Sequence, residues 1–466
     1  MIVLLSRSKT FIPSFRRVFA YYSTSLPNTL DIAGKKYDTD SNYTNVTPSI
    51  LSHVNENLHL RKHHPINTLR ELIENTLNSV DNTFKTYNSF SPIVTTYQNF
   101  DVLDIPVDHP GRSKSDTYYI NKDYLLRTHT SAHELECFHD LLLQENITNR
   151  GFLISADVYR RDEIDRTHYP VFYQMEGARI WDRSSLALLK SDLSKLENKL
   201  LDIDKGKNII RLIVQDDVSL EGNPKQNYMT MEEYDLCSRH LKRSIELLIK
   251  QAFAQKIKNM TTADINQTTT ELNVRWIKTS FPWTAPSWEI EVWWNGEWLE
   301  LCGCGLIKQD VLLKAGYRSD STIGWAFGLG LDRIAMLLFE IPDIRLLWTK
   351  DERFHQQFRD GAITSFKPYS KYPGSMRDMA FWLPDESLYV ELHENDIMEI
   401  VRSVAGNLVE SVKLIDKYRT PDTNRTSLCY RINYQSMDRN ITNQEVNKLQ
   451  ELVQDQLMSK YNVILR

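Results

Sequence analysis

An Asn-Gly pair between two runs of aromatic and apolar residues limits what the middle of this 466-residue chain can become. The stretch WEIEVWWNGEWLELCGCGL occupies residues 288–306, and Asn-Gly in such a setting is a strong signal for a β-hairpin. The stretch GWAFGLGLDRIAMLLF, residues 324–339, follows as a strand that turns into a helix. We therefore expect the α+β fold class, with an antiparallel sheet flanked by helices.

Two glycines of the second stretch, Gly328 and Gly330, match only part of a dinucleotide-binding fingerprint. Position 333, where that fingerprint requires a third glycine, is Arg, and no parallel βαβ unit is predicted around it. The spacing instead places Arg333 in the first turn of a helix, beside backbone that lacks Cβ atoms. Such a turn favours a flat ring or a phosphate group lying close to the strand.

A second predicted hairpin, VYRRDEIDRTHYPVFYQMEG at residues 158–177, carries many charges of both signs around its tip. Arg160 stands where the first strand ends, and the planar guanidinium fork of arginine pairs with two phosphate oxygens at once. A solvated loop needs no such order of charges. We therefore expect Arg160, Arg333 and His168 to converge on a site for a polyanion.

The returning strand of the same hairpin predicts a site for an ammonium group. Gln174 and Glu176 are two residues apart, so their side chains share one face of the strand. An amide oxygen beside a carboxylate suits an ammonium group. Taken singly, aromatic residues are more often core and arginines more often surface ion pairs, so the prediction depends on the combination. The predicted walls of an apolar slot beside this site are Phe281, Trp283 and Phe327.

The charge balance and the cysteines exclude several other classes of protein. The formal net charge is −5, so a polyanion site must be local. Five scattered cysteines indicate a reducing compartment without a disulfide framework. Cys302 and Cys304 lack the second pair that a zinc site needs, so we interpret both as packing residues. No apolar run approaches the roughly 18 residues of a membrane span, and no membrane association is expected.

The first 30 residues contain no Asp or Glu but include Arg7, Lys9, Arg16 and Arg17. A segment rich in Arg and Ser and poor in acids is typical of a mitochondrial transit peptide, which we predict over residues 1–25. The alternative is a disordered arm without a targeting role.

Further along, the chain divides into a larger and a smaller predicted domain. The larger spans 26–342 and has a helical insertion over 184–258. Within it, Ser131 and Glu134 form a capping-box pattern, which predicts the start of a helix. A polar linker is predicted over 343–368. From 369 to 466 the elements follow the order β-α-β-β-α-β, which is the ferredoxin-like motif.

Several stretches together resemble class II aminoacyl-tRNA synthetases, and among them the single-chain phenylalanyl-tRNA synthetases of mitochondria. DHPGR at 108–112 resembles motif 1, the 158–177 hairpin motif 2, and GWAFGLGLDR at 324–333 motif 3. The amino-acid-site segments are matched by RTHTSAHE, FPWTAPSWE and WLELCGCG. The matches occur in order from about residue 45 to the end, which makes them far more specific than any one motif.

The resemblance implies an ATP-dependent ligase that converts L-phenylalanine to phenylalanyl-adenylate and transfers the acyl group to tRNA(Phe). It implies ATP and Mg²⁺ as cofactors, without zinc or haem, and a monomer that works in the mitochondrial matrix. The ferredoxin-like domain would read the anticodon.

The resemblance also assigns residues to roles. Arg160 and Arg333 would be the catalytic residues, on the α- and γ-phosphates of ATP respectively. The further ATP contacts would be Asp162, Thr167, His168 and Tyr169. The phenylalanine site would comprise Ser131, Ala132, His133, Glu134, Gln174, Met175, Glu176, Phe281, Trp283, Glu300, Ala326 and Phe327. Ala326 would lie at the para edge of the substrate ring, and Glu300 is also the candidate metal ligand.

Three positions depart from the family's usual pattern and leave the shape of the pocket open. Asp162 stands where Glu is more usual, Tyr173 where His is frequent, and Trp283 in place of the second Phe of a Phe-Pro-Phe segment. The candidate anticodon contacts are Arg419, Arg425 and Arg431, for which a solvated rim is the alternative.

Two other functions remain open at this point. One is a synthetase-like RNA-binding protein without catalysis, which the presence of Arg160, Glu176 and Arg333 disfavours. The other is a ligase of the same fold that adenylates a small acid without using tRNA, which the C-terminal domain disfavours.

Overall fold

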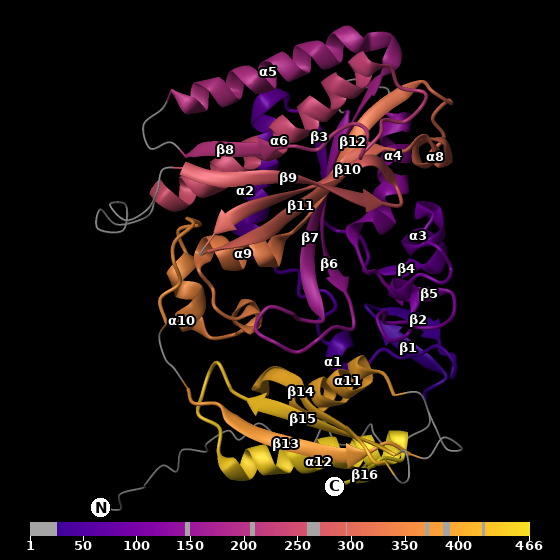
Figure 1. The fold of residues 1–466 in the computed structure, drawn as a ribbon, viewed down its shortest axis with the longest axis vertical. Coiled ribbons are helices and arrows are strands. Elements are labelled where there is room, and N and C mark those ends of the chain that lie inside the picture. The colour runs from indigo at the N-terminus through magenta and orange to yellow at the C-terminus, as the bar shows by residue number, and fades with distance from the viewer. Residues whose placement is uncertain are drawn as a thin grey trace, which may run out of the picture.

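A computed structural model of the protein describes residues 26–144, 150–205, 210–258, 271–294, 296–368, 372–384, 392–421 and 425–466. The predicted transit peptide lies outside these described residues, as does Asn295 of the first hairpin. A large body of helices and strands lies above a smaller one formed by the C-terminal part of the chain (Figure 1).

The large body is built on one eight-stranded sheet. In spatial order its strands are β3 (Phe84–Tyr87), β6 (Gly151–Tyr159), β7 (Val171–Asp182), β12 (Thr322–Gly330), β11 (Glu297–Ile307), β10 (Thr284–Trp294), β9 (Glu271–Phe281) and β8 (Arg211–Asp216). The strands from β6 to β9 in this order pair antiparallel, and only the edge strands β3 and β8 pair parallel to their neighbours. The predicted α+β class is therefore confirmed.

The first hairpin has the expected register, with Trp293 opposite Trp298 across the β10–β11 turn. Gly296 in that turn has φ +90°, which glycine adopts without the steric cost that a Cβ would bring. Because β12 pairs antiparallel on both sides, the turn after it is not part of a βαβ unit. The structure thus agrees with the interpretation that Gly328 and Gly330 do not form a dinucleotide-binding fingerprint.

Helices pack against this sheet and bury its main core (Figure 1). They are α2 (Pro65–Asp81), α5 (Leu186–Asp204), α6 (Met231–Lys258) and α9 (Leu331–Phe339). The predicted helical insertion over 184–258 needs correction on two points. It contains the edge strand β8, and α6 contributes fully buried residues such as Leu241 and Ile245 to the main core. Its apolar face covers the sheet, so α6 belongs to the core of the domain.

Shorter elements complete the large body. The strands are β1 (Thr29–Ile32), β2 (Lys35–Asp38), β4 (Ile93–Thr95) and β5 (Tyr124–Leu126), and the helices are α1 (Pro48–Leu51), α3 (Thr96–Asn99), α4 (Glu134–Leu143), α8 (Gln309–Lys314) and α10 (Glu352–His355). The 3₁₀ turns are η3 (Asp101–Leu103), η4 (Pro110–Arg112), η5 (Thr130–His133), η6 (Arg183–Ser185), η7 (Ile344–Trp348), η8 (Gln356–Phe358) and, in the smaller body, η10 (Gly406–Leu408).

The stretch predicted as a linker, residues 343–368, is largely packed into the large body. Leu347, Phe354 and Phe358 are fully buried, and all three belong to the main apolar cluster. Their helical segments are only three to five residues long, which hides the apolar period in the sequence. The linker prediction is therefore corrected for most of this range.

The smaller body has the predicted ferredoxin-like order. It comprises β13 (Ser375–Trp382), α11 (Glu394–Ala405), β14 (Val409–Arg419), β15 (Thr426–Tyr434), α12 (Asn443–Tyr461) and β16 (Ile464–Leu465). Its sheet has the order β14-β15-β13-β16, and α11 and α12 pack together beside it. Its own apolar cluster includes Phe381, Ile432 and Val453, so the domain has a core of its own.

The two bodies meet at the tip of the β6–β7 hairpin, which lies above β14 and α11 (Figure 1). Arg161 forms a 2.9 Å ion pair with Asp396 of α11, and both side chains are mostly buried. Arg402 donates to the backbone oxygen of Asp162 at 2.7 Å. Ile164 belongs to the apolar cluster of the smaller body, and its carbonyl accepts from the backbone of Val412. The hairpin tip is thus held by the C-terminal domain.

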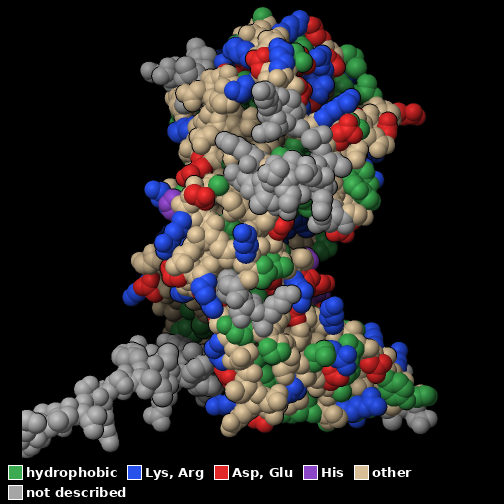
Figure 2. All heavy atoms as spheres, turned by 90° about the vertical axis from the view of Figure 1, so that its left-hand side faces the viewer, with side chains coloured by type: hydrophobic (Ala, Val, Ile, Leu, Met, Phe, Trp, Pro, Cys, Tyr) green, Lys and Arg blue, Asp and Glu red, His purple; other side chains and the backbone are tan. Residues whose placement is uncertain are grey.

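Charged side chains of both signs are interspersed over the face in Figure 2, and Lys and Arg do not gather there into one field. This agrees with a polyanion site that is local. Among the described residues, no helix combines the length and the apolar character that crossing a bilayer requires.

Candidate active site

A cavity of about 310 Å³ opens over β7, β12 and β11, where these strands face η5 and the end of β6. Arg160, Gln174, Glu176 and Glu300 supply its charged and amide groups. The remaining lining residues are His129, Thr130, Ser131, Phe281, Trp283, Thr284, Gly303, Cys304, Ala326, Phe327 and Gly328. Segments far apart in the sequence therefore meet in one site.

The carboxylate of Glu176 is the most enclosed charged group lining this cavity, with a side chain that is 3% exposed. Its Oε2 accepts from the Thr130 hydroxyl at 3.0 Å and from the Ser131 hydroxyl at 2.8 Å. Its Oε1 has no partner among the described residues. Burial raises the pKa of Glu176 to about 7, although the two hydroxyl donors oppose the shift.

Gln174 lies beside Glu176 on β7, and its Oε1 accepts from the backbone N–H of Thr130 at 3.3 Å. Both side chains line the cavity, as the two-residue period of a strand predicts. One carboxylate oxygen is left without a donor next to an amide oxygen. This arrangement suits an ammonium group, which is a donor only.

The capping-box prediction for Ser131 and Glu134 is wrong. The residue that precedes α4 is His133, which forms no side-chain cap, and the Ser131 hydroxyl donates to Glu176 instead of accepting from the helix. Ser131 lies in the 3₁₀ turn η5, one turn before α4 begins. The hydroxyl is therefore available to the site.

Away from Glu176 and Gln174, the groups of the site are two arginines, Arg160 and Arg333, and one acid, Glu300. The Nε of Arg160 donates to the Thr128 carbonyl at 2.9 Å, and its guanidinium lies 5.2 Å from the Phe172 ring centroid. Arg333 lies in the first turn of α9, as predicted, and its side chain is 62% exposed. Its Nη1 is 3.6 Å from Oε2 of Glu300, which lines the cavity. Arg160 thus reaches the cavity directly, and Arg333 lies at its border.

Aromatic rings and glycines shape the apolar part of the cavity. The rings of Phe281 and Trp283 stack with centroids 6.0 Å apart. A Cβ on Gly303 would lie 2.6 Å from the Phe281 ring, and one on Gly177 would lie 2.6 Å from the Phe327 ring. These two glycines make room for the rings that form the slot. At Gly328, by contrast, a Cβ would meet nothing within 4 Å, so this part of the strand stays open to a ligand.

Ala326 closes one side of the slot and is 3% exposed. It belongs to an apolar cluster with Phe152, Ile154 and Ile307, which lie behind it. The size of its side chain therefore limits how far a ring can extend in this direction.

Four predicted substrate residues do not line the cavity. Met175 lies between Gln174 and Glu176, so it faces the opposite side of β7 and is fully buried in the main core. Its assignment to the substrate site is corrected on this ground. Ala132 lines a separate cavity of about 290 Å³, and His133 stacks on Phe90 with centroids 4.3 Å apart. Glu134 is fully buried and does not line the cavity.

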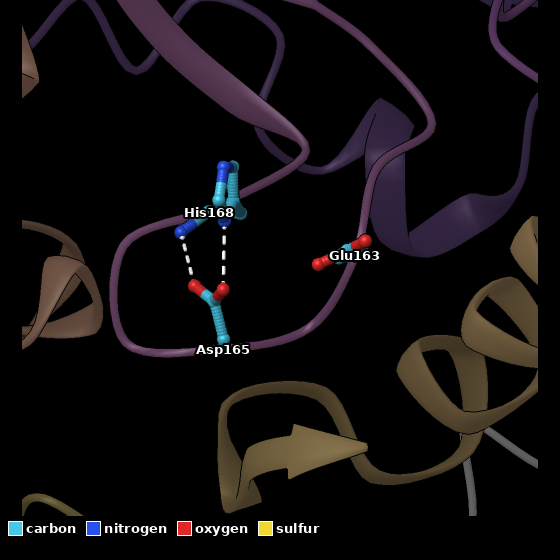
Figure 3. A group of neighbouring side chains, drawn as sticks. All are labelled: Glu163, Asp165 and His168. Carbon is cyan, nitrogen blue, oxygen red and sulfur yellow. Dashed lines mark hydrogen bonds and ion pairs between the residues drawn. The ribbon is translucent and has the colours of Figure 1, made fainter. Parts of the chain in front are cut away.

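The predicted ATP contacts at the hairpin tip also lie elsewhere. His168 and Tyr169 line a second cavity, of about 250 Å³, between the two bodies. The ring of His168 bonds to Asp165 across the tip at 2.8 Å, with Glu163 nearby (Figure 3). The expected convergence of His168 with Arg160 and Arg333 is therefore not found, because the C-terminal domain holds the tip. The ATP roles of Asp162, Thr167, His168 and Tyr169 stay predictions.

Two groups of acids are chemically able to hold a cation. Glu163, Asp165 and His168 bring ligand atoms within 4.8 Å of one another, but Asp165 already accepts from His168 and from the backbone of Thr167. The second group is Glu300 with Glu289 on the adjacent strand. Burial and the nearby charge of Glu300 raise the pKa of Glu289. The two acids lie on neighbouring strands, and the metal role of Glu300 stays a prediction.

Sequence reasoning missed several residues that line the cavity. They are His129, Thr130, Thr284, Gly303 and Cys304, whereas Gly328 was predicted to leave room for a ligand and does line the cavity. Most stand inside the stretches already singled out, and Thr130 lies next to the predicted Ser131. Their position next to predicted site residues was the signal that could have found them. The sequence does not show which of these neighbours faces the cavity, because that depends on the path of η5 and of the strands. Cys302 and Cys304 are buried in the main core, as expected for packing residues.

The outer face of the C-terminal sheet carries a second cluster of arginines and aromatic rings. Trp382 and Tyr418 lie on either side of Ser427, with ring centroids 6.3 Å apart. The guanidinium of Arg466 lies 5.3 Å from the Trp382 ring and 5.7 Å from the Tyr418 ring, and that of Arg425 lies 5.5 Å from Trp382. We call Trp382, Tyr418, Arg425 and Arg466 the outer patch.

The outer patch contains only one of the three predicted anticodon arginines. Arg431 forms a two-pronged ion pair with Asp378 at 2.7 and 2.8 Å, so its charge is already matched. Arg419 is exposed at the end of β14. Trp382 and Arg466 were not predicted, because their meeting depends on the pairing of β13 with β16 at the end of the chain.

Comparison with known families gives two matches that together cover most of the chain. A model described as "tRNA synthetases class II core domain (F)" matches residues 51–209 and 239–358. A model described as "Ferredoxin-fold anticodon binding domain" matches residues 370–466. The boundary between the two matches agrees with the division into two bodies.

Two mitochondrial relatives are similar over most of the chain, and a bacterial subunit is similar over more than half of it. The chain is 60% identical to the mitochondrial phenylalanine–tRNA ligase of Saccharomyces cerevisiae, over 96% of this chain and 97% of that protein. It is 41% identical to the mitochondrial phenylalanine–tRNA ligase of Mus musculus, over 91% of this chain and 86% of that protein. A phenylalanine–tRNA ligase alpha subunit from Synechocystis is 32% identical over 57% of this chain and 59% of that protein.

Proposed function

The chain belongs to the mitochondrial phenylalanine–tRNA ligases of class II, and from this premise we propose how its own residues carry out the reaction. It is a ligase that activates L-phenylalanine with ATP and joins the phenylalanyl group to tRNA(Phe). The observation that carries the assignment of residues is the pairing of Glu176 and Gln174 beside an aromatic slot. A free amino acid with an aromatic side chain fits that combination.

We assign the substrate ammonium to Glu176 and Gln174. The free Oε1 of Glu176 and the amide oxygen of Gln174 would accept from it, while the Thr130 and Ser131 hydroxyls fix the carboxylate from the other side. The ring of phenylalanine would then lie between Phe281, Trp283 and Phe327. Ala326 would meet its para edge, so a para substituent would clash with a wall that has little room to retreat.

In the first step, an oxygen of the phenylalanine carboxylate attacks the α-phosphorus of ATP. The bond from that phosphorus to the bridging oxygen breaks, and pyrophosphate leaves with the electron pair. Negative charge grows on the phosphate oxygens, where Arg160 would stabilise it, while Arg333 would hold the departing end. No protein nucleophile is needed, so catalysis depends on positioning and on charge stabilisation.

Class II synthetases use ATP with Mg²⁺, and Glu300 with Glu289 are the residues that would hold the ion. The ion supplies charge neutralisation on the phosphates. Mg²⁺ keeps several waters and binds through one or two carboxylates plus phosphate oxygens, which fits two acids on neighbouring strands. We propose that zinc and haem have no part in this chain.

In the second step, a hydroxyl of the terminal ribose of the tRNA attacks the carbonyl carbon of phenylalanyl-adenylate and forms the ester. The bond from that carbon to the phosphate oxygen breaks, AMP leaves with the electron pair, and the hydroxyl proton passes to its phosphate or to water. The C-terminal domain would bind the anticodon loop through the outer patch. Unpaired loop bases are recognised by stacking on aromatic side chains and on arginine planes, and both are present there. Arg425 is retained from the predicted contacts, Arg419 stays a prediction, and Arg431 is replaced by Arg466.

The chain functions in mitochondria, in line with its relatives, and we propose the matrix as the compartment. We also propose a monomer, as the resemblance to single-chain synthetases implies. A sedimentation measurement at micromolar concentration gives the mass, and a dimer at that concentration would contradict the proposal.

Amino-acid-dependent ATP–pyrophosphate exchange across all twenty amino acids tests the assignment. We expect exchange with phenylalanine alone at comparable concentration, followed by charging of tRNA(Phe) in a second assay. Absence of exchange would favour an RNA-binding protein without catalysis. Exchange with a small acid and no charging would favour a ligase that does not use tRNA.

A further inference from the structure

A second carboxyl group, that of Glu134, is buried close enough to Glu176 for the charges of the two acids to interact. Glu134 is the first residue of α4 and its side chain is fully buried. Neither of its carboxyl oxygens has a hydrogen-bond partner among the described residues, and Oε1 of Glu176 has none either. Two acids thus share one enclosed corner, although an amino acid brings a single ammonium group to it.

The charged and titratable groups around this corner do not neutralise a second anion. Two residues of β11 line the cavity, namely Cys304 and Glu300, and Glu300 is itself an acid. In α4 the neighbours are Cys137 and Glu136, and the Glu136 carboxylate is bonded to His133. Arg127 contacts His133 but forms its ion pair with Asp157, and burial lowers the pKa of His129 to about 3, so that ring is neutral. Arg160 is the cation that lines the cavity, and it lies at the phosphate end.

A second negative charge here would be unfavourable for three reasons. Burying an ion without a partner costs several kcal/mol, and a nearby like charge adds to that cost. Burial, together with the charge of Glu176, holds the pKa of Glu134 well above its usual range. In the proposed reaction the substrate carboxylate and the ATP phosphates also meet in this cavity, and another anion would repel both.

We propose that Glu134 and Glu176 act as a pair with one negative charge, in which Glu134 is the protonated member and matches the site to a single ammonium group. Glu134 is then a positioning residue, and of the two acids only Glu176 binds the substrate ammonium, together with Gln174. The inference rests on the proposed function, since it concerns the same amino-acid site.

The same substitution at the two positions tests the pair. Glu134→Gln replaces a neutral acid with a neutral amide of the same shape, so the KM for phenylalanine in pyrophosphate exchange stays within about threefold of the unsubstituted protein. Glu176→Gln removes the charge, and we expect that KM to rise by at least about 30-fold, since truncating one partner of a buried charge pair is costly. An equal rise in both variants would overturn the proposal, because Glu134 would then carry charge.

The pH dependence gives a second readout, which shows which of the two acids titrates. As pH falls through about 7, Glu176 takes up a proton, loses its charge, and the KM for phenylalanine rises. Glu134→Gln preserves this rise with the same midpoint within about half a pH unit. A profile that becomes flat in Glu134→Gln would show that Glu134 is the group that titrates, and would overturn the proposal.

A third measurement starts from the unsubstituted protein, so its first result needs no variant. Infrared spectroscopy of the unsubstituted protein at pH 8 is expected to show the carbonyl stretch of a buried protonated carboxylic acid, and a well-folded Glu134→Gln protein is expected to lose it. Absence of such a band in the unsubstituted protein would overturn the proposal. If phenylalanine supports no exchange in any form of the protein, the proposed function fails instead, and the two failures are distinguishable.

Discussion

The catalytic cavity and the outer patch of the C-terminal sheet both combine arginine with aromatic rings, but they hold these groups differently. In the cavity the charged groups approach from fixed strands, and Glu176 is almost fully enclosed. On the outer patch Arg466 is exposed and lies over two rings at the surface, of which Tyr418 is 43% exposed. The cavity is closed on several sides, whereas the patch is open.

The difference follows from the ligands that we propose for the two regions. A small zwitterion must be fixed to within a fraction of an ångström before its carboxylate can attack, and enclosed groups strengthen every charge contact. An RNA loop is large and highly charged, and its bases stack on any exposed ring. Substitutions in the cavity should therefore act on adenylate formation, and those on the patch should act on charging only.

The largest expected effect comes from the phosphate end of the cavity. Arg160→Ala and Arg333→Ala are each expected to lower pyrophosphate exchange by ~10²–10³, since each removes a donor that stabilises developing charge. Arg431→Ala, which removes an arginine that is already paired with Asp378, is the matched control and should leave exchange unchanged. Exchange within a few-fold of the unsubstituted protein for either cavity variant, with the fold intact by circular dichroism, would refute the assignment.

The next effect concerns the wall of the slot. Ala326→Gly is expected to admit para-chlorophenylalanine, because removing one methyl group changes discrimination by ~1–3 kcal/mol, or roughly 10- to 200-fold. The measurement is the ratio of kcat/KM for phenylalanine and its para-chloro analogue in pyrophosphate exchange. If the ratio is the same in both proteins, the para edge of the ring lies elsewhere in the cavity.

Removing the C-terminal domain separates the two regions outright. In a chain ending after residue 368, we expect the rate of adenylate formation to stay within about tenfold of that of the full-length protein. The rate of tRNA charging should fall by more than about tenfold. Low salt should restore charging in part, because the phosphate contacts that remain strengthen as salt falls. The contacts of Arg161 and Ile164 with this domain are lost in the shortened chain, so its folding must be checked by its melting curve. Loss of adenylate formation in a well-folded chain would make the domain part of the catalytic core.

The smallest effect is expected on the patch itself. Trp382→Ala is expected to raise the KM for tRNA about fivefold, towards the low end of the ~1–3 kcal/mol for base stacking, because Tyr418 remains. Pyrophosphate exchange should not change. Arg431→Ala serves again as the control, and its KM for tRNA should stay within about twofold, as expected for an exposed ion pair. A larger effect of Arg431→Ala than of Trp382→Ala would show that RNA binds to another part of the face.

Local patterns predicted what depends on neighbours in the sequence. The hairpin turn at Gly296, the start of α9 before Arg333 and the shared face of Gln174 and Glu176 all follow from turn chemistry or strand period. The same period also places Met175 on the opposite face, so that error was avoidable from the sequence. The ferredoxin-like order was equally readable, because each of its elements has its own period and turn.

Tertiary packing decided the rest, because contacts between distant segments leave no local signature. Ser131 was expected to cap a helix, yet its hydroxyl binds Glu176 because η5 lies against β7. His168 was expected beside the two arginines, yet the C-terminal domain draws the hairpin tip into a separate cavity. The burial of Glu134 without a hydrogen-bond partner depends on how α4 packs against the sheet. The sequence determined which groups carry the chemistry, and the fold determined which of them face the same cavity.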